Sequence, residues 1–248
     1  MIKIENSQVV GLEPAIRGIR NPMNSWKKSD SDYRVVLSKK CDECGRYMLP
    51  EDDSCDGCEI SEIHLDGYTI GPNDHDLMMS LAKQGAVHGK FRRMIVVYVD
   101  ITAPLYWWKQ FDTYQVGTVK NSCSTMHKIH AKEFTLEDFS HEHLIMEEPI
   151  PGHVYSPLGM MATTVENLNI IRELFLETRD KKWWWQMIAL LPSCYNQKRT
   201  VMLNYEVLAN IYQYRREHKL DEWRELCKWI EGLPYSGIIT CNAGGRRP

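Results

Sequence analysis

The hydrophobic and polar positions of this chain switch between a period of two residues and a period near 3.6. The first pattern predicts strands at residues 2–10, 33–38 and 92–101, the last of them rich in valine and isoleucine. The second predicts helices that alternate with those strands along the chain. Their expected ranges are 13–20, 73–84, 104–115, 134–143, 163–179, 181–191 and 221–230.

The stretch 191–223 has the most unusual pattern. It opens as a loop and a strand and then reads as one long helix with one face unlike a core stripe. That face carries Asn204, Leu208, Ile211, Arg215 and His218. A helix that faces a core would place aliphatic side chains at both ends, because buried polar groups cost free energy unless they are paired. The pattern favours a face that lines a site for an anion or a cofactor; the alternative is a helix lying across the surface.

Composition narrows the protein class. The 248 residues suit one large domain or two small ones, and 43% hydrophobic residues are enough for a sizeable core. A net charge of −3 gives no general attraction to nucleic acid or to a membrane surface. There is no apolar run long enough to span a bilayer, and the first residues lack a signal-peptide pattern. We therefore expect a cytoplasmic protein with reduced thiols and no membrane partner.

Four of the eight cysteines form two Cys-x-x-Cys pairs, Cys41 with Cys44 and Cys55 with Cys58. Each pair can place two thiolates on one ion, and a hairpin between the pairs would close a tetrahedral site that suits zinc. Such a site has no open position, so the metal would be structural. The alternatives are two unrelated pairs of free thiols, or a redox disulfide. We expect a small zinc-ribbon-like insertion at 39–60, flanked by two strands.

A polar loop follows the helix that we expect at 104–115. Hydroxyl groups near cations suit phosphate oxygens, although an ordinary polar loop has the same composition. The candidate residues are Ser122, Ser124, Thr125, His127, Lys128 and His130.

Two segments resemble the flavin-dependent thymidylate synthases, the ThyX family. In the first, His88, the pair Ala103-Pro104 and Gln110 match the family without a gap. The second matches at four polar positions of the long helix. These are Asn204, Asn210, Arg215 and His218.

The resemblance implies an α+β, ThyX-like mixed helix and sheet domain over residues 1–248, interrupted by the zinc insertion. It also implies a homotetramer with active sites between subunits. The cofactor would be FAD, near His88, Asn204, Asn210 and His218. Gln110 and Arg215 would contact a pyrimidine nucleotide.

The chain departs from the family signature Arg-His-Arg, which is replaced here by Thr113, Tyr114 and Gln115. Guanidinium groups hold phosphates through paired hydrogen bonds, so this loss removes anion-binding charge. Ser122, Ser124 and Arg199 are the residues that we expect to take over substrate binding.

The resemblance implies flavin-dependent transfer of a one-carbon group to a dUMP-like deoxynucleotide. Folate would be the donor and NADPH the reductant, and no catalytic residue can be assigned. The alternative is a non-catalytic nucleotide-binding or assembly protein on the same scaffold.

Overall fold

The computed structural model describes residues 2–41, 47–48 and 60–241. They fall into two compact units: a sheet unit, residues 1–10 and 96–248, and a hairpin unit, residues 11–95. Within the described ranges, no helix is both long and apolar enough to cross a membrane.

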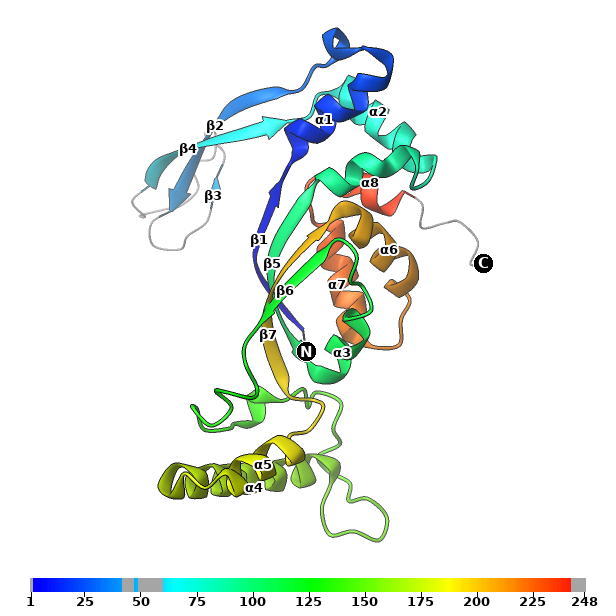
Figure 1. Ribbon diagram of the computed structural model, residues 1–248. Helices are drawn as coiled ribbons and strands as arrows, with labels where there is room; N and C mark the ends of the chain where they lie inside the picture. Colours follow the sequence, from blue (N-terminus) through cyan, green and yellow to red (C-terminus); the bar gives the residue numbers. More distant parts are fainter. Residues whose placement is uncertain (1, 42–46, 49–59, 242–248) are drawn as a thin grey trace. The chain divides into compact units, whose positions relative to one another are not determined.

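The sheet unit is built on four antiparallel strands in the order β1-β5-β7-β6 (Figure 1). Side chains alternate along β5: Val97, Val99 and Ile101 are at most 1% exposed, whereas Tyr98 is 44% exposed. This alternation confirms a strand with one buried face, but β5 begins later than predicted, because residues 88–94 form a 3₁₀ segment instead. The strands are β1 (Lys3–Val10), β5 (Val96–Pro104), β6 (Thr118–Ser122) and β7 (Asn196–Asn204).

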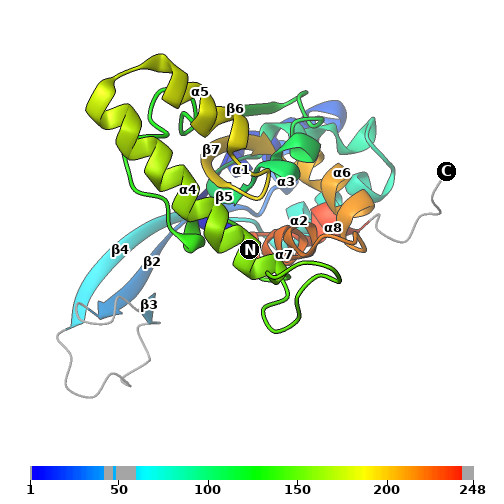
Figure 2. The same ribbon diagram turned by 90° about the horizontal axis from the view of Figure 1, so that it is seen from below.

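The buried face of this sheet is covered by α3, α6 and α7 (Figures 1 and 2). Their shared core is aromatic: Trp107 and Trp223 are fully buried, with ring centroids 4.8 Å apart, and Phe111 stacks on Trp107 at 5.0 Å. Arg215 and Arg199, described below, lie over tryptophan rings of this core. The helices are α3 (Leu105–Phe111), α6 (Tyr205–Arg215), α7 (Asp221–Glu231) and the short α8 (Gly237–Thr240).

The long helix predicted to carry Asn204 through His218 ends earlier than expected, whereas the helix predicted at 221–230 is confirmed as α7. Asn204 ends β7 and caps α6, because its side-chain oxygen accepts hydrogen bonds from Glu206 N and Val207 N. The helix stops at Arg215, and α7 starts at Asp221 after a turn. Two acidic residues in the first turn of α7 favour a new helix start there. The predicted polar face therefore divides into three parts: the capping residue Asn204, the buried aliphatic residues Leu208 and Ile211, and the end of α6 with the turn that carries His218.

A helical hairpin of α4 (Pro157–Thr178) and α5 (Lys181–Leu190) forms a second core in the sheet unit. The helix α4 begins before the predicted Thr163, because Ser156 caps it by accepting from Gly159 N and Pro157 suits the first turn. The helix predicted at 134–143 is only the 3₁₀ turn η4 (Leu136–Asp138). A capping box between Thr135 and Asp138 satisfies that short turn.

The hairpin unit joins two helices to a long antiparallel hairpin. The strands β2 and β4 pair from Asp32 opposite Thr69 to Cys41 opposite Ile60, which confirms the two strands expected around the insertion. The carboxylate of Asp74 is fully buried and accepts from Arg20 Nε at 2.7 Å, which ties α2 to α1. The elements are α1 (Leu12–Arg20), η1 (Asn21–Met23), η2 (Trp26–Lys28), β2 (Asp32–Cys41), β3 (Tyr47–Met48), β4 (Ile60–Thr69), α2 (Pro72–Lys83) and η3 (His88–Met94).

Candidate functional site

The end of α6 holds a guanidinium group on an aromatic platform. Arg215 Nε donates to the Tyr114 hydroxyl at 3.1 Å, and the guanidinium carbon lies 4.7 Å from the Trp223 ring centroid. Arg215 has no acidic partner among the described residues, and its two terminal nitrogens have no hydrogen-bond partner there. The platform fixes the orientation of a cation whose remaining donors are open to an anion.

The same tryptophan orients an amide. Trp223 Nε1 donates to Gln110 Oε1 at 2.9 Å, across 113 positions of sequence, and leaves the amide nitrogen of Gln110 as a donor. We call Gln110, Tyr114, Arg215, His218 and Trp223 the indole cluster. It unites Gln110 and Arg215, the two residues predicted to contact a nucleotide.

His218 joins the indole cluster from the turn after α6. Its ring lies 6.2 Å from the Trp223 ring, and its Nδ1 accepts from Leu220 N at 3.1 Å. Burial lowers the pKa of His218, and the nearby positive charges of Arg215 and Arg224 lower it further. The imidazole is therefore neutral at pH 7, with its proton on Nε2.

Arg199 sits on a second buried tryptophan but is already paired. Its guanidinium lies 4.2 Å from the Trp108 ring, NH1 is 2.9 Å from Asp112 Oδ1, and Nε donates to Gln197. Lys120 Nζ lies 2.9 Å from the same Asp112 oxygen. Two cations thus share one carboxylate, which leaves one net positive charge at this place.

Of the two serines predicted to bind substrate, Ser122 lies next to the Arg199–Asp112 ion pair and Ser124 lies in the loop that follows β6. Ser122 stands opposite Arg199 in the register of β6 and β7, so it is close to the Arg199 pair. Ser124 accepts a hydrogen bond from His127 N at 2.9 Å, which closes a turn in the following loop. Ser122 is positioned beside a cation, and the Ser124 oxygen serves the loop.

The hairpin unit contains a cavity of about 770 Å³ between α1, α2 and η3. Its walls are largely apolar, and cationic side chains join them at several points. Arg20 is among these, and its NH2 is buried without a hydrogen-bond partner. The cationic residues and the predicted flavin contact that line it are Arg20, Lys28, His88 and Lys90. This combination suits a large aromatic or acyl ligand that carries negative charge.

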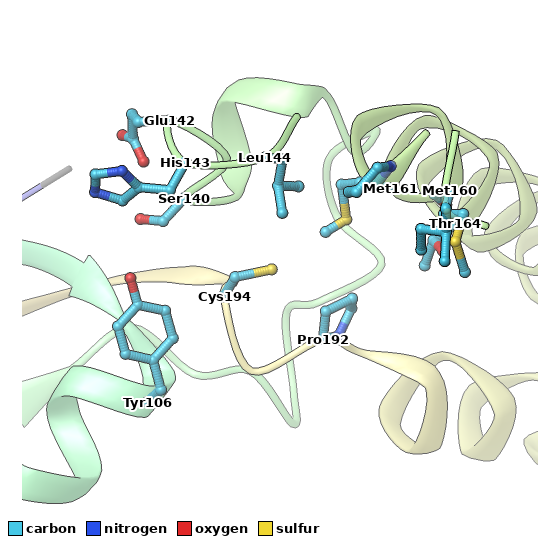
Figure 3. A pocket seen from close by; sticks show the side chains of 12 residues that line it. Tyr106, Ser140, Glu142, His143, Leu144, Met160, Met161, Thr164, Pro192 and Cys194 are labelled. Carbon is cyan, nitrogen blue, oxygen red and sulfur yellow. The ribbon is translucent and has the colours of Figure 1, made fainter. Parts of the chain in front are cut away.

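A cavity of about 520 Å³ lies between α3, α4 and the loop before β7 (Figure 3). Figure 3 shows the hydroxyls of Tyr106 and Ser140 at one end and the thiol of Cys194 in the middle. Tyr106 donates to Glu222, and burial raises the pKa of both Tyr106 and Cys194. The thiol is therefore protonated at neutral pH, so this cavity holds no activated nucleophile.

Three solved structures that match this chain hold a pyrimidine nucleotide. Thymidylate synthase X (ThyX) from Helicobacter pylori, with FAD and dUMP, superimposes with a TM-score of 0.63 at 14% identity, covering 99% of this chain and 100% of that one. The chain has the ThyX fold. A second structure of the Helicobacter pylori enzyme, also with FAD and dUMP, gives 0.61 at 15% identity, covering 95% and 96%.

A third neighbour is the UMP/dUMP methylase PolB from Streptomyces cacaoi, bound with 5-Br dUMP. It gives a TM-score of 0.58 at 11% identity, covering 100% of this chain and 97% of that one. No family model matches the sequence, and no curated protein matches it. The predicted resemblance is thus confirmed for the fold, over the whole length of the chain.

The residues predicted near the flavin are divided between the two units, with His88 in the hairpin unit and the other three in the sheet unit. Asn204 caps α6 with its side-chain oxygen, and its amide nitrogen lies against Gly117. Gly117 has φ +77°, and a Cβ there would come within 2.7 Å of that nitrogen, so the contact requires glycine. Asn210 is exposed on α6, and His88 begins η3 in the hairpin unit.

The predicted zinc ligands cannot be placed in the same way. Cys44, Cys55 and Cys58 lie outside the described residues, and Cys41 ends β2. Elsewhere, within the ranges that the structure describes, His, Cys, Asp and Glu side chains form no group of three that could hold a metal ion.

Sequence reasoning missed two members of the indole cluster. Tyr114 was noted only as a substituted signature residue, yet its hydroxyl accepts from Arg215. Trp223 falls in the helix predicted at 221–230 and was not assigned to a site, yet it joins Gln110 to Arg215 from α7. The only available signal was the number of tryptophans, eight in 248 residues, which does not say which of them lies at a site.

Proposed function

We propose that this protein binds a pyrimidine deoxynucleotide such as dUMP at the indole cluster and transfers a one-carbon group to it, in a reaction that depends on FAD. The observation that carries the proposal is Arg215, held over Trp223 with two unpartnered nitrogens beside the oriented amide of Gln110. A guanidinium suits a phosphate or a pyrimidine oxygen, and an amide suits the polar edge of the base. The dUMP-bound fold neighbours support this choice of ligand.

A second positive position supports phosphate binding. Arg199, Lys120 and Ser122 lie together on β6 and β7, with one carboxylate for two cations. The net charge there can attract an anion, and the Ser122 hydroxyl can donate to it. These residues would supply part of the charge that Thr113, Tyr114 and Gln115 lack.

The residues of the hairpin unit fit a flavin. Its cavity of about 770 Å³ has apolar walls for a ring system, with Lys28 and Lys90 for negative charge and His88 in the lining. The buried, unpartnered NH2 of Arg20 is an orphan donor in the same lining. When bound, FAD would supply the electron transfer, and these residues would hold and orient it. Folate and NADPH are the donor and reductant that we propose to accompany it.

A non-catalytic nucleotide-binding protein is the second candidate. One observation favours it: Arg215 Nε already donates to the Tyr114 hydroxyl. Tyr114 stands at a position of the Arg-His-Arg signature, where a cationic side chain would bind phosphate more strongly than a neutral hydroxyl. A protein with this arrangement could bind a nucleotide and hold it without turnover.

Two measurements separate these functions. Calorimetry with dUMP, dTMP and dCMP, with and without FAD, should show binding of at least one nucleotide that is lost in Arg215→Gln. Absorbance of oxidised flavin in the purified protein, and a product heavier by one methyl group with folate donor and NADPH, would support the enzyme. Binding without product would leave the second candidate, and no binding would reject both.

Two further proposals follow from the sequence. The protein would act in the cytoplasm. It would assemble as a homotetramer, and light scattering on the purified protein can test this oligomeric state. It would also hold one structural zinc per chain on Cys41, Cys44, Cys55 and Cys58. Metal analysis of freshly purified protein should find one zinc per chain, and Cys55→Ser should lose it; zinc-free wild type would refute the site.

A further inference from the structure

The positive charges of three residues act on His130, and no described acidic side chain pairs with any of them. Lys128 lies in the loop after β6, and Arg172 and Arg179 lie on and just after α4. None of the three forms an ion pair with a described residue. Unpaired cations repel one another, so their convergence is unfavourable unless an anion binds between them.

Contacts with the loop and with one aromatic ring hold two of these cations in place. Arg172 Nε donates to the backbone oxygen of His130 at 2.9 Å, which leaves its two terminal nitrogens as donors. The His130 ring meets the Phe175 ring edge to face at 4.9 Å, and the Arg179 guanidinium lies 5.9 Å from the same ring. The spacing of Arg172, Phe175 and Arg179 places them along one side of α4.

His130 itself has an unused polar atom. Its Nδ1 is buried and has no hydrogen-bond partner in the part of the chain that the structure describes. Burial lowers the pKa of His130, and the charges of Arg179, Lys128 and Arg172 lower it further, with no carboxylate acting against them. The ring is neutral in the absence of a ligand and lies among three positive charges.

The helix dipole does not account for this cluster. Cations are favoured at a helix C-terminus, which would explain Arg179 after the last residue of α4, Thr178. Arg172, however, lies more than one turn inside the helix, and Lys128 belongs to a separate loop. The effect falls off within the last turn, so it leaves two of the three cations unexplained.

We propose that Lys128, His130, Arg172 and Arg179 form a binding site for a di- or triphosphate group. Several donors on separate elements suit a ligand with several negative oxygens better than a single carboxylate. This site shares no residue with the indole cluster and does not depend on the function proposed for that cluster. The bound phosphate group could come from free pyrophosphate or from the phosphate chain of a nucleotide.

Titration calorimetry with inorganic pyrophosphate and with dUDP tests the site. Wild type should bind pyrophosphate, and affinity should fall at least tenfold in Lys128→Gln and in Arg179→Gln, neither of which removes a hydrogen bond within the protein. Arg216→Gln, an exposed neighbour of Glu217, is the matched control and should leave binding unchanged. Tighter binding of dUDP than of pyrophosphate, lost in the same two variants, would identify a nucleotide as the source.

The imidazole of His130 provides a second, independent readout. A bound anion favours the charged ring, so nuclear magnetic resonance should show the pKa of His130 rising when pyrophosphate is added. The proposal fails if wild type binds neither ligand, if Arg216→Gln weakens binding as much as Arg179→Gln, or if the His130 signal does not move. It also fails if a single-stranded oligonucleotide binds through these residues more tightly than both phosphates, because the surface would then serve a nucleic acid.

Discussion

Arg215 and Arg199 each lie over a fully buried tryptophan of the sheet unit, but their polar surroundings differ. Arg199 is joined to the carboxylate of Asp112, whereas Arg215 contacts only the neutral hydroxyl of Tyr114. The ring beneath Arg199, Trp108, donates to a backbone oxygen, and the ring beneath Arg215, Trp223, donates to the side chain of Gln110. The same cation on the same kind of platform is thus built into the fold in one place and left available to a ligand in the other.

The largest expected effect is on nucleotide binding at Arg215. Arg215→Gln removes the two free nitrogens, and hydrogen bonds to charged groups contribute about 1.5–3 kcal/mol. We expect affinity for the best-binding nucleotide to fall tenfold or more, with a smaller loss of stability from the broken bond to Tyr114. Calorimetry on Arg215→Gln and on the exposed control Arg216→Gln measures this. Equal losses in both variants would mean that Arg215 is no special contact.

Arg199→Gln should reduce stability more, and nucleotide affinity less, than Arg215→Gln does. It leaves Asp112 paired only with Lys120, and half-exposed ion pairs contribute about 1 kcal/mol or less. For a chain of this size 1 kcal/mol corresponds to about 2–4 °C in the unfolding temperature. We expect a larger fall in Arg199→Gln than in Arg215→Gln, because Arg199 loses an ion pair and a bond to Gln197, whereas Arg215 loses one bond to a neutral hydroxyl. Nucleotide affinity should also fall, because one terminal nitrogen of Arg199 has no partner among the described residues. If Arg199→Gln unfolds like wild type, its ion pair is not structural and the contrast with Arg215 disappears.

The sequence could predict those parts of the fold that depend on neighbouring residues. The strand at 2–10, the helix at 181–191 and the strands around the insertion follow from local periodicity. The end of α6 at Arg215 was missed, because the helical period runs on to His218 without a glycine or proline. The late start of β5 was missed because Arg92 and Phe91 are buried in a 3₁₀ segment that mimics a strand in sequence.

The candidate site was less predictable, because its contacts are distant in sequence. Gln110 and Arg215 were chosen by resemblance, but Tyr114 meets Arg215 across 101 positions and Trp223 meets Gln110 across 113. No local pattern specifies which tryptophan lies under an arginine. The ion pair of Arg199 with Asp112 was missed for the same reason, since 87 positions separate the two residues.

Tyr114→Phe sharpens the comparison with a smaller effect. It removes the hydroxyl that accepts from Arg215 Nε and keeps the aromatic ring. A neutral hydrogen bond contributes about 1 kcal/mol, so we expect nucleotide affinity to fall several-fold as Arg215 becomes less well oriented. Calorimetry on this variant decides between two roles for the hydroxyl. Tighter binding would show that Tyr114 competes with the ligand for Arg215, which would favour the non-catalytic function.

The smallest expected effect is a pH dependence of stability that arises beside Arg215 and not beside Arg199. Burial and the charges of Arg215 and Arg224 lower the pKa of His218 from 6.5, although Glu222 acts weakly in the other direction. As the pH falls below 6.5, the unfolded chain therefore takes up the proton first, and the folded state loses stability. Protonation also breaks the bond from Leu220 N, because Nδ1 can then no longer accept.

His218→Asn keeps an acceptor at that position but does not titrate, so its denaturant midpoint should decline less than that of wild type between pH 6.5 and more acid values. His130 titrates in the same direction in both proteins, so the difference between the two curves isolates His218. Parallel curves would mean that the imidazole is not held neutral at the indole cluster.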